Sequence, residues 1–240
     1  DGPDHLFLGI IRYLSLKGRG NYLCLERWAA LRRSSVLTPE QARLVAKVLV
    51  WLQDTQSGDR AELRLAPEEA PAWAMVSARG GDLAAGRCTL ARKGLCFVQA
   101  ARNRAEGAHV VVVNHALLLA DAARGGGLLP EYRHLIVDEA HHVNADERAG
   151  PTLGYKLAQR LVEERMVLSM VCFTGTPHRG KNFGFLALLR LLRPDLFNPR
   201  ESLVAQLPHL REAVIRNNKQ GVTDLRGQAL FQPPAVTSET

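Results

Sequence analysis

Three short apolar segments, separated by stretches with helical spacing, limit this chain to few folds. They cover residues 109–113, 134–138 and 169–173, and each has the length and composition of a buried strand. Strands that alternate with helices are typical of α/β proteins, in which helices cover both faces of a parallel sheet. The sequence therefore predicts an α/β fold built on a parallel sheet with flanking helices.

Helical segments are expected between and beside these strands. Thr38 as N-cap and Pro39 in the first turn mark the start of one helix. Asn21 and Asn114 are suitable N-caps for two others. Residues 54–87 are rich in glycine, proline, alanine and charge and show little periodicity, so they are expected to form a loosely ordered insertion. The expected helices cover residues 22–33, 39–53, 96–108, 116–121, 153–167, 182–192 and 200–215.

The net charge bears on the kind of partner. The 240 residues carry a formal charge of +7 and a pI near 9.6, which favours an anionic partner without identifying one. No apolar run has the length of a membrane span and no leader peptide begins the chain, so a soluble, cytoplasmic protein without membrane contact is expected. The first residue is not methionine and the final residues are polar, so both ends are expected to continue in a longer protein.

Two adjacent carboxylates follow the second apolar segment, in the order Asp138-Glu139-Ala140-His141. The carboxyl end of a parallel strand is where an α/β sheet binds its ligands. There Asp138 would hold Mg²⁺ through water, and Glu139 would orient and polarise the water that attacks the γ-phosphate of ATP. The alternative is a buried strand followed by a capped helix, with Asp138 as the N-cap and His141 on a solvated face. The nucleotide interpretation is favoured, because the motif does not stand alone.

Thr174 and Thr176 follow the third apolar segment. They resemble the third motif of the helicases, and this resemblance implies that their hydroxyls hydrogen-bond the acid motif and link phosphate state to the grip on DNA; the alternative is that they satisfy local backbone groups. Residues 175–182 nearly match the phosphate-loop pattern G-x-x-x-x-G-K-[ST], but Asn182 replaces the hydroxyl that binds Mg²⁺, and Pro177 lacks an N–H group. No other phosphate loop occurs in the 240 residues.

Several ordered motifs lie between Leu16 and about His142: Lys17-Gly18-Arg19-Gly20-Asn21-Tyr22-Leu23-Cys24, Cys96-Phe97, Ala105-Glu106, Val113-Asn114-His115-Ala116-Leu117-Leu118-Leu119 and Val137-Asp138-Glu139-Ala140-His141. In these motifs the chain resembles the DinG and XPD-type iron–sulfur DNA helicases of superfamily 2. The resemblance implies most of a RecA-like motor lobe that lacks its first strand and phosphate loop. It divides the chain into the start of a helicase segment at 1–24, a helical, iron–sulfur-domain-like insertion at 25–95, a partial RecA-like lobe at 96–215 and a linker toward an absent second lobe at 216–240.

The remaining motifs run from about Tyr155 to the end of the chain: Thr174-Gly175-Thr176-Pro177-His178-Arg179-Gly180-Lys181, the helix Phe185–Leu192 with Pro194-Asp195-Leu196-Phe197, and Val214-Ile215-Arg216-Asn217-Asn218-Lys219. Here the chain resembles the Swi/Snf-type translocases of double-stranded DNA. Only 35 residues separate Asp138 from Thr174, whereas the iron–sulfur family would place a long helical insertion there. The sequence is therefore interpreted as a join of two helicase lineages at their shared acid motif.

The resemblances imply ATP-dependent unwinding or translocation of DNA, with ATP and Mg²⁺ as cofactors. The implied partners are DNA and the missing motor segments, including a second RecA-like lobe, and the chain alone is expected to show no DNA-stimulated ATPase activity. Two alternatives are a non-catalytic nucleic-acid-binding module with a degenerate helicase fold and a non-functional fragment. The residues implied for catalysis are Asp138, Glu139, His141, Thr174 and Thr176, and those implied for DNA contact are Lys17, Arg19, Asn21, Asn114, His115, Arg179 and Lys181.

The cysteines raise the question of a metal cluster. Cys172 lies in an expected strand and is interpreted as a small core residue. Cys24, Cys88 and Cys96 fall where the iron–sulfur helicases place cluster ligands, but that family uses four thiolates and one is missing between Cys24 and Cys88. Three interpretations are open: a three-cysteine cluster, a site completed by a ligand such as Asp82, and reduced thiols without a cluster.

Overall fold

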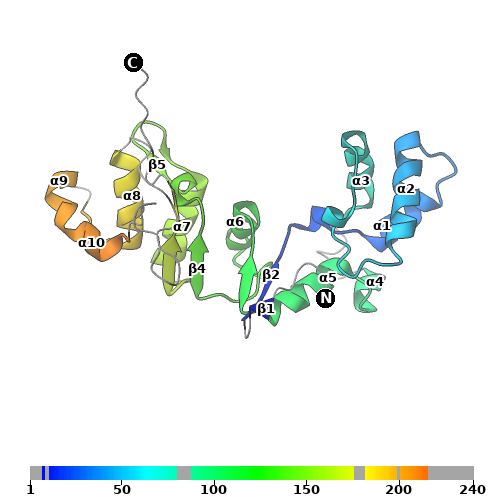
Figure 1. Cartoon of the computed structure of the whole chain (residues 1–240), viewed down its shortest axis with the longest axis horizontal. Coiled ribbons are helices and arrows are strands. Elements are labelled where there is room, and N and C mark those ends of the chain that lie inside the picture. Colours follow the sequence, from blue (N-terminus) through cyan, green and yellow to red (C-terminus); the bar gives the residue numbers. More distant parts are fainter. Residues whose placement is uncertain (1–6, 9–10, 80–87, 176–181, 199–200, 216–240) are drawn as a thin grey trace, which may run out of the picture. The chain divides into compact units, whose positions relative to one another are not determined.

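The computed structural model describes residues 7–8, 11–79, 88–175, 182–198 and 201–215. The chain divides into two compact units, Asp1–Tyr132 and Arg133–Thr240, which are described separately (Figure 1). Both contain helices and parallel strand pairs, so the expectation of an α/β fold is confirmed. Among the described helices, none combines the length and the apolar character that crossing a membrane requires.

A three-stranded sheet organises the first unit, with the strand order β1-β2-β3. In this sheet β2 is parallel to β3, and Leu14 lies opposite Val111. These two residues face the helices α5 and α6, whose apolar residues pack with them in one core cluster. The bounds are Phe7–Leu8 for β1, Ile11–Ser15 for β2, Val110–Val112 for β3, Phe97–Glu106 for α5 and His115–Ala123 for α6. Asn114 caps α6 as predicted, because its side chain accepts a hydrogen bond from the N–H group of Leu117 at 2.8 Å.

The other face of this sheet is exposed. Ile11, Val110 and Val112 lie on it, and each is roughly half exposed. The predicted strand at 109–113 is therefore present, but the expectation that it is buried and that the sheet is covered on both faces is wrong for the described residues. The reason is that the helices of this unit which pack against the strands do so on the side of Leu14 and Val111.

A second core in the first unit is made by helices. The capping box of α2 is complete: Thr38 accepts a hydrogen bond from the backbone of Gln41, and the Gln41 side chain accepts one from Thr38. Leu44, Val48 and Trp73 are almost fully buried in this core. The elements are η1 (Arg19–Asn21), α1 (Leu25–Arg32), α2 (Pro39–Trp51), η2 (Arg60–Glu62), η3 (Pro67–Glu69), α3 (Ala70–Val76) and α4 (Thr89–Arg92).

Residues 54–79 are ordered, which corrects the expectation of a loose insertion over 54–87; residues 80–87 lie outside the described part of the chain. Side-chain contacts that the sequence spacing does not reveal impose this order. The Glu62 carboxylate accepts hydrogen bonds from Trp51 Nε1 at 2.8 Å, Thr55 Oγ1 at 2.5 Å and Ser57 Oγ. Trp73 then inserts between α1 and α2.

The first helix begins later than predicted. It starts at Leu25 with Cys24 as its N-cap, and residues 19–21 form the separate turn η1. Asn21 does not cap a helix; its side-chain amide donates a hydrogen bond to the carbonyl of Gly18 at 3.0 Å. The polar side chain therefore stabilises the turn that carries the basic residues.

A parallel pair of strands organises the second unit. Leu135 of β4 lies opposite Met170 of β7, and α7 and α8 cover their side of the pair. Ile136 and Phe173 lie on the other side and are 64% and 55% exposed, so this face too is uncovered in the described structure. The elements are β4 (His134–Val137), η5 (Ala140–His142), β5 (Ala145–Asp146), β6 (Gly150–Pro151), α7 (Leu153–Glu163), β7 (Ser169–Cys172) and α8 (Asn182–Leu192).

The helix predicted at 200–215 is broken into three short turns, because Pro208 supplies no N–H group for a continuous helix. The turns are α9 (Leu203–Gln206), η6 (Leu207–His209) and α10 (Leu210–Ala213). α10 packs beside α8 around the fully buried Phe197.

The buried carboxylate of Glu69 should make stability depend on pH. It is 1% exposed and accepts hydrogen bonds from Lys47 Nζ at 2.6 Å and from the backbone of Ala66 at 2.7 Å. The bond from Lys47 is the main cause that lowers the pKa of Glu69 below its usual value. A lowered pKa stabilises the fold above the unfolded-state pKa of about 4.3, and this contribution is lost as the pH falls through the folded-state value.

Glu69→Gln is therefore expected to lower the free energy of unfolding by roughly 1–2 kcal/mol at pH 7, with a smaller difference from the wild type near pH 3. Urea unfolding at both pH values, followed by circular dichroism, measures this. Glu68→Gln, which removes the neighbouring exposed carboxylate, serves as the control. A difference that is equal at both pH values would contradict the assignment.

Candidate functional site

The acid motif leaves the carboxyl end of β4 and is fastened to the end of β7. Asp138 and Glu139 are exposed, whereas Ala140 is fully buried. The N–H group of Ala140 donates to the carbonyl of Phe173 at 2.9 Å. Asp138 Oδ1 accepts a hydrogen bond from the N–H group of Glu139, also at 2.9 Å. Glu139 has a left-handed backbone conformation, with φ 50° and ψ 42°, which turns the chain sharply after the strand.

His141 connects the acid motif to the threonine at the end of β7. Its Nδ1 atom lies 3.1 Å from Thr174 Oγ1 and 3.0 Å from Glu139 Oε2. The ring is 8% exposed, so the alternative that placed it on a solvated face is wrong. Asp138 is not an N-cap either, because the short helix η5 has Glu139 at that position. The structure thus brings together Glu139, His141 and Thr174, whereas Thr176 lies outside the described residues.

The two carboxylates can bind a hard cation only with help from other ligands. No group of three or more His, Cys, Asp or Glu residues suited to a metal ion occurs in the described ranges. Mg²⁺ commonly takes one or two carboxylates and completes its shell with water and phosphate oxygens. Asp138 fits such a role, because its carboxylate is exposed at the strand end and belongs to no ion pair within the described structure.

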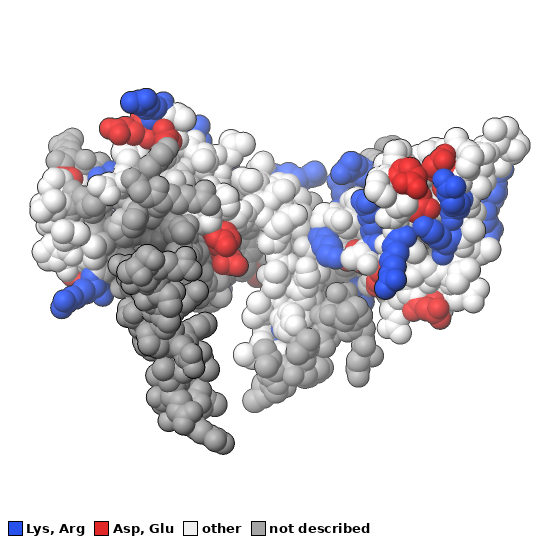
Figure 2. Space-filling model, turned by 45° about the horizontal axis from the view of Figure 1, so that its top comes forward, with Lys and Arg blue, Asp and Glu red and all other residues white. Residues whose placement is uncertain are grey.

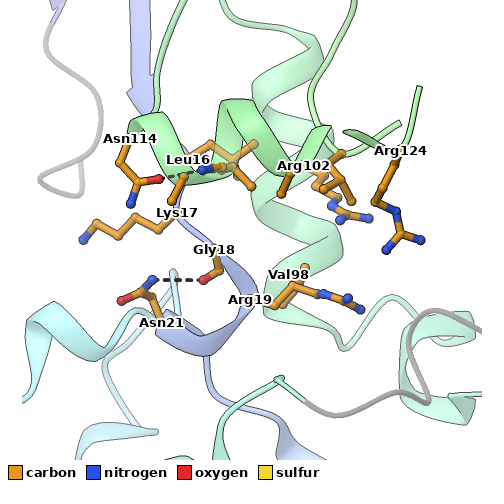
Figure 3. A pocket seen from close by; sticks show the side chains of 13 residues that line it. Leu16, Lys17, Gly18, Arg19, Asn21, Val98, Arg102, Asn114 and Arg124 are labelled. Carbon is orange, nitrogen blue, oxygen red and sulfur yellow. Dashed lines mark hydrogen bonds between the residues drawn. The ribbon is translucent and has the colours of Figure 1, made fainter. Parts of the chain in front are cut away.

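A basic pocket of about 300 Å³ lies in the first unit, between the turn η1 and the helices α5 and α6 (Figure 3). It gathers four of the residues implied for DNA contact: Lys17, Arg19, Asn21 and Asn114. His115 is exposed and is not among the residues that line the pocket, and Arg179 and Lys181 lie outside the described residues.

Two further arginines line this pocket that the sequence analysis missed, Arg102 on α5 and Arg124 at the end of α6. Burial, and the charges of Arg19 and then Arg124, lower the pKa of Arg102. The sequence did contain a signal that could have identified Arg102 as a pocket residue. It follows Val98 by four residues, so the two share one face of the predicted helix. No motif marked Arg124.

The lining of the pocket differs from the general surface charge, because it contains basic residues and no acidic residue. On the face shown in Figure 2, Lys and Arg side chains gather over the first unit with acidic side chains between them. Of the basic residues that line the pocket, Lys17 is paired with an acid from outside the lining, because its Nζ atom lies 2.5 Å from Asp59 Oδ2. A mixed surface of this kind binds nucleic acid weakly, so the pocket is the more specific candidate.

Cys24, Cys88 and Cys96 line one narrow pocket together with Glu26. Cys88 Sγ donates to Glu26 Oε2 at 3.7 Å, and burial is the main cause that raises the pKa of the Cys24 thiol. The pocket measures about 10 Å³, and among the described residues these side chains do not form a group that could hold a metal ion, so this arrangement does not fit an iron–sulfur cluster with its four thiolate ligands.

Cys172 does not line this pocket. The alternative ligand Asp82 lies outside the described part of the chain. Cys172 is in β7 and packs against the core of the second unit, as predicted, and burial raises its pKa to about 11.

Comparison with known proteins gives relatives that carry the names DinG and YoaA. The ATP-dependent helicase DinG of Mycobacterium tuberculosis (strain ATCC 25618 / H37Rv) is 33% identical over 195 residues, which cover 70% of this chain and 29% of that protein. The ATP-dependent DNA helicase YoaA of Escherichia coli (strain K12) is 35% identical over 152 residues, 60% of this chain and 23% of that protein. The 3'-5' exonuclease DinG of Bacillus subtilis (strain 168) is 31% identical over 142 residues, 58% of this chain and 15% of that protein. No family model matches the chain.

These relatives bear on the two resemblances in the sequence. The chain spans less than a third of the length of each relative. A match to 70% of the chain is longer than residues 16–142 and, since only 15 residues precede Leu16, it includes residues after His142. None of the three relatives is named as a Swi/Snf-type translocase, so the second resemblance gains no support from them.

Proposed function

This chain is homologous to the DinG-type ATP-dependent helicases of superfamily 2 over most of its length, and we propose that it forms part of a motor that couples ATP hydrolysis to DNA unwinding or translocation. One observation carries the proposal. The acid motif at the end of β4 and the threonine at the end of β7 are joined through His141. Glu139, which would respond to a bound phosphate, is thereby connected through His141 to Thr174 at the end of the neighbouring strand.

Each residue of the motif has a distinct task in this proposal. Asp138 binds Mg²⁺ through water, and Mg²⁺ when bound neutralises charge on the β- and γ-phosphates of ATP. Glu139 orients the attacking water and accepts its proton. Ala140 keeps the turn close to β7, because its N–H group is held by Phe173.

His141 is proposed as a positioning residue rather than a reacting one. Its Nδ1 atom can donate to the Glu139 carboxylate or accept from the Thr174 hydroxyl, depending on the tautomer. When Glu139 turns toward a bound nucleotide, Nδ1 gives up its contact with Glu139 and keeps the one with Thr174. This exchange of partners is the proposed link between the nucleotide and the end of β7.

The chain on its own lacks groups that hydrolysis needs. Its 240 residues contain no phosphate loop, and thus no lysine with backbone N–H groups to hold the β- and γ-phosphates. They also contain no motif of a second motor lobe, whose arginine finger is worth roughly 10³–10⁵ in rate. We therefore propose that ATP and DNA are handled together with further motor segments. Cys24, Cys88 and Cys96 are proposed to be reduced thiols that hold no cluster, since the pocket they line does not fit one.

A transplant into a relative tests this function. The chain alone is expected to hydrolyse no ATP above background with or without single-stranded DNA. When it replaces the matching segment of the Mycobacterium tuberculosis relative, DNA-stimulated ATP hydrolysis is expected, and Glu139→Gln should lower its rate by roughly 10²-fold or more. Glu147→Gln, which changes an exposed acid of the same unit, is the control.

The rival proposal, a non-catalytic module that only grips nucleic acid, gives a different result. It expects a chimera that binds DNA in a salt-sensitive manner but has no ATPase activity, whatever residue stands at 139. ATP hydrolysis by the unmodified chain that disappears in Glu139→Gln would show instead that the chain needs no further segments.

A further inference from the structure

Three arginines gather at one side of the basic pocket. The guanidinium groups of Arg19, Arg102 and Arg124 come from η1, α5 and α6, respectively, and lie together in Figure 3, whereas Lys17 extends to the opposite side. None of the three forms an ion pair with any acid in the described structure, although most basic groups near protein interiors do. The cluster therefore has unused donors on three separate elements.

Two acids that act on the basic groups of the pocket are already engaged. Asp59 pairs with Lys17, at 2.5 Å. Asp121 is buried, and its Oδ1 atom accepts hydrogen bonds from the N–H groups of Leu128 at 2.7 Å and Leu129 at 3.0 Å. Its charge holds the loop after α6 and only partly offsets the arginines, because the pKa of Arg102 is still lowered by burial and then by Arg19 and Arg124. An anion among the three guanidinium groups would relieve this repulsion.

The rest of the pocket suits the same kind of ligand. Helix α6 begins at the pocket, with Asn114 and Leu117 among the lining residues, so the positive end of its dipole lies there. The floor is apolar, formed by residues such as Leu16 and Val98. Its 300 Å³ lie at the lower end of small-ligand pockets, enough for a phosphate group and an attached sugar or base.

We propose that Arg19, Arg102 and Arg124 form a binding site for one phosphate group of a nucleic-acid strand. That the phosphate belongs to a nucleic acid rests on the proposed motor function. That the site binds an anion rests on the geometry of the pocket alone. Guanidinium groups bind phosphate through paired hydrogen bonds, and three of them surround its oxygens from different elements. The phosphate is either an internal phosphodiester or a terminal 5′-phosphate.

Single-site variants of the full chain test the site. Binding of a short 3′-labelled oligothymidylate, with and without a 5′-phosphate, is measured by fluorescence anisotropy over a range of salt concentrations. Arg102→Gln and Arg124→Gln are each expected to weaken binding by about tenfold or more. Each should also reduce the slope of log affinity against log salt by about 0.7, the value for one phosphate contact on a single strand.

Arg104→Gln is the matched control. It removes the same charge from the same helix, but residue 104 is rotated by about 200° from residue 102 and does not line the pocket. This variant should change the affinity by less than about threefold. Equal loss in all three variants would overturn the site in favour of a general positive field. A loss confined to the 5′-phosphorylated strand identifies a terminal phosphate, and a loss with both strands identifies the backbone.

Inorganic pyrophosphate separates failure of the site from failure of the motor proposal. It should raise the melting temperature of the wild type and of Arg104→Gln, but not that of Arg102→Gln. If the wild type binds no DNA but shows this response, the phosphate site stands and its proposed source in nucleic acid is wrong. If pyrophosphate has no effect and DNA does not bind, the site itself is refuted. Circular dichroism of each variant confirms that it is folded.

Discussion

Trp73→Ala is expected to lower the free energy of unfolding by about 3–5 kcal/mol, the largest loss for a single side chain in the first unit. Trp73 is 2% exposed and lies in the core cluster formed by α1, α2 and α3. Its ring meets the Trp51 ring edge to face, with 6.5 Å between the centroids. Alanine would remove this contact and leave a cavity that the three helices cannot close without moving.

The same substitution should also weaken the phosphate site. Trp73 Nε1 donates a hydrogen bond to the carbonyl of Gly20 at 2.8 Å, and Gly20 lies in the turn between Arg19 and Asn21. Trp73→Phe separates the two effects. It keeps most of the packing but loses the hydrogen bond, so it should reduce DNA affinity with a smaller loss of stability, about 1 kcal/mol.

Denaturant unfolding monitored by circular dichroism measures the stability loss in Trp73→Ala. Val50→Ala, which truncates an exposed residue of α2, is the control and should change stability by less than about 0.5 kcal/mol. A loss in Trp73→Ala as small as that of the control would mean that the helical core does not depend on this ring.

Gly58→Ala is expected to cost about 2–4 kcal/mol, because two effects add at this position. The backbone has φ +64°, which is unfavourable for any residue with a β-carbon. The added Cβ would also lie 2.2 Å from Cγ of the Phe97 ring, so the ring would have to shift within a packed core. Phe97 is the first residue of α5, the helix that carries Arg102.

Gly94→Ala isolates the backbone effect. Gly94 has a similar φ of +73°, but nothing lies within 4 Å of an added Cβ, so only about 1 kcal/mol should be lost. Thermal or urea unfolding of both variants gives the comparison. Equal losses would show that the Phe97 ring moves away at no cost, and DNA binding by Gly58→Ala would then be unchanged.

The features that the sequence predicted correctly are determined by neighbouring residues. The capping side chains of Thr38 and Asn114 act within three positions along the chain. The acid motif is also local, because it consists of a strand and the residues that follow it. The position of Cys172 in a strand follows from the apolar run around it.

The features that the sequence missed depend on tertiary contacts. Residues 54–79 show little periodicity, and their order comes from Glu62 bonding to Trp51 of α2 and from Trp73 packing with α1 and α2. The partnership of Arg102 with Arg124 joins two helices that no motif connects. The uncovered strand faces contradict a rule that holds for whole parallel sheets. Two of the missed features did have a local signal: Pro208, which interrupts the last predicted helix, and the four-residue spacing of Arg102 from Val98.

The left-handed backbone at Glu139 has a consequence for engineering. Arg165 shares this conformation, but there it closes the end of α7, where such a residue is common. Position 139 follows a strand, and glycine there would relieve roughly 1 kcal/mol of strain. A search for thermostable variants would therefore favour Glu139→Gly and, with it, the loss of the carboxylate proposed to activate water. At residue 139 a change that raises the stability of the fold would lower the rate of ATP hydrolysis.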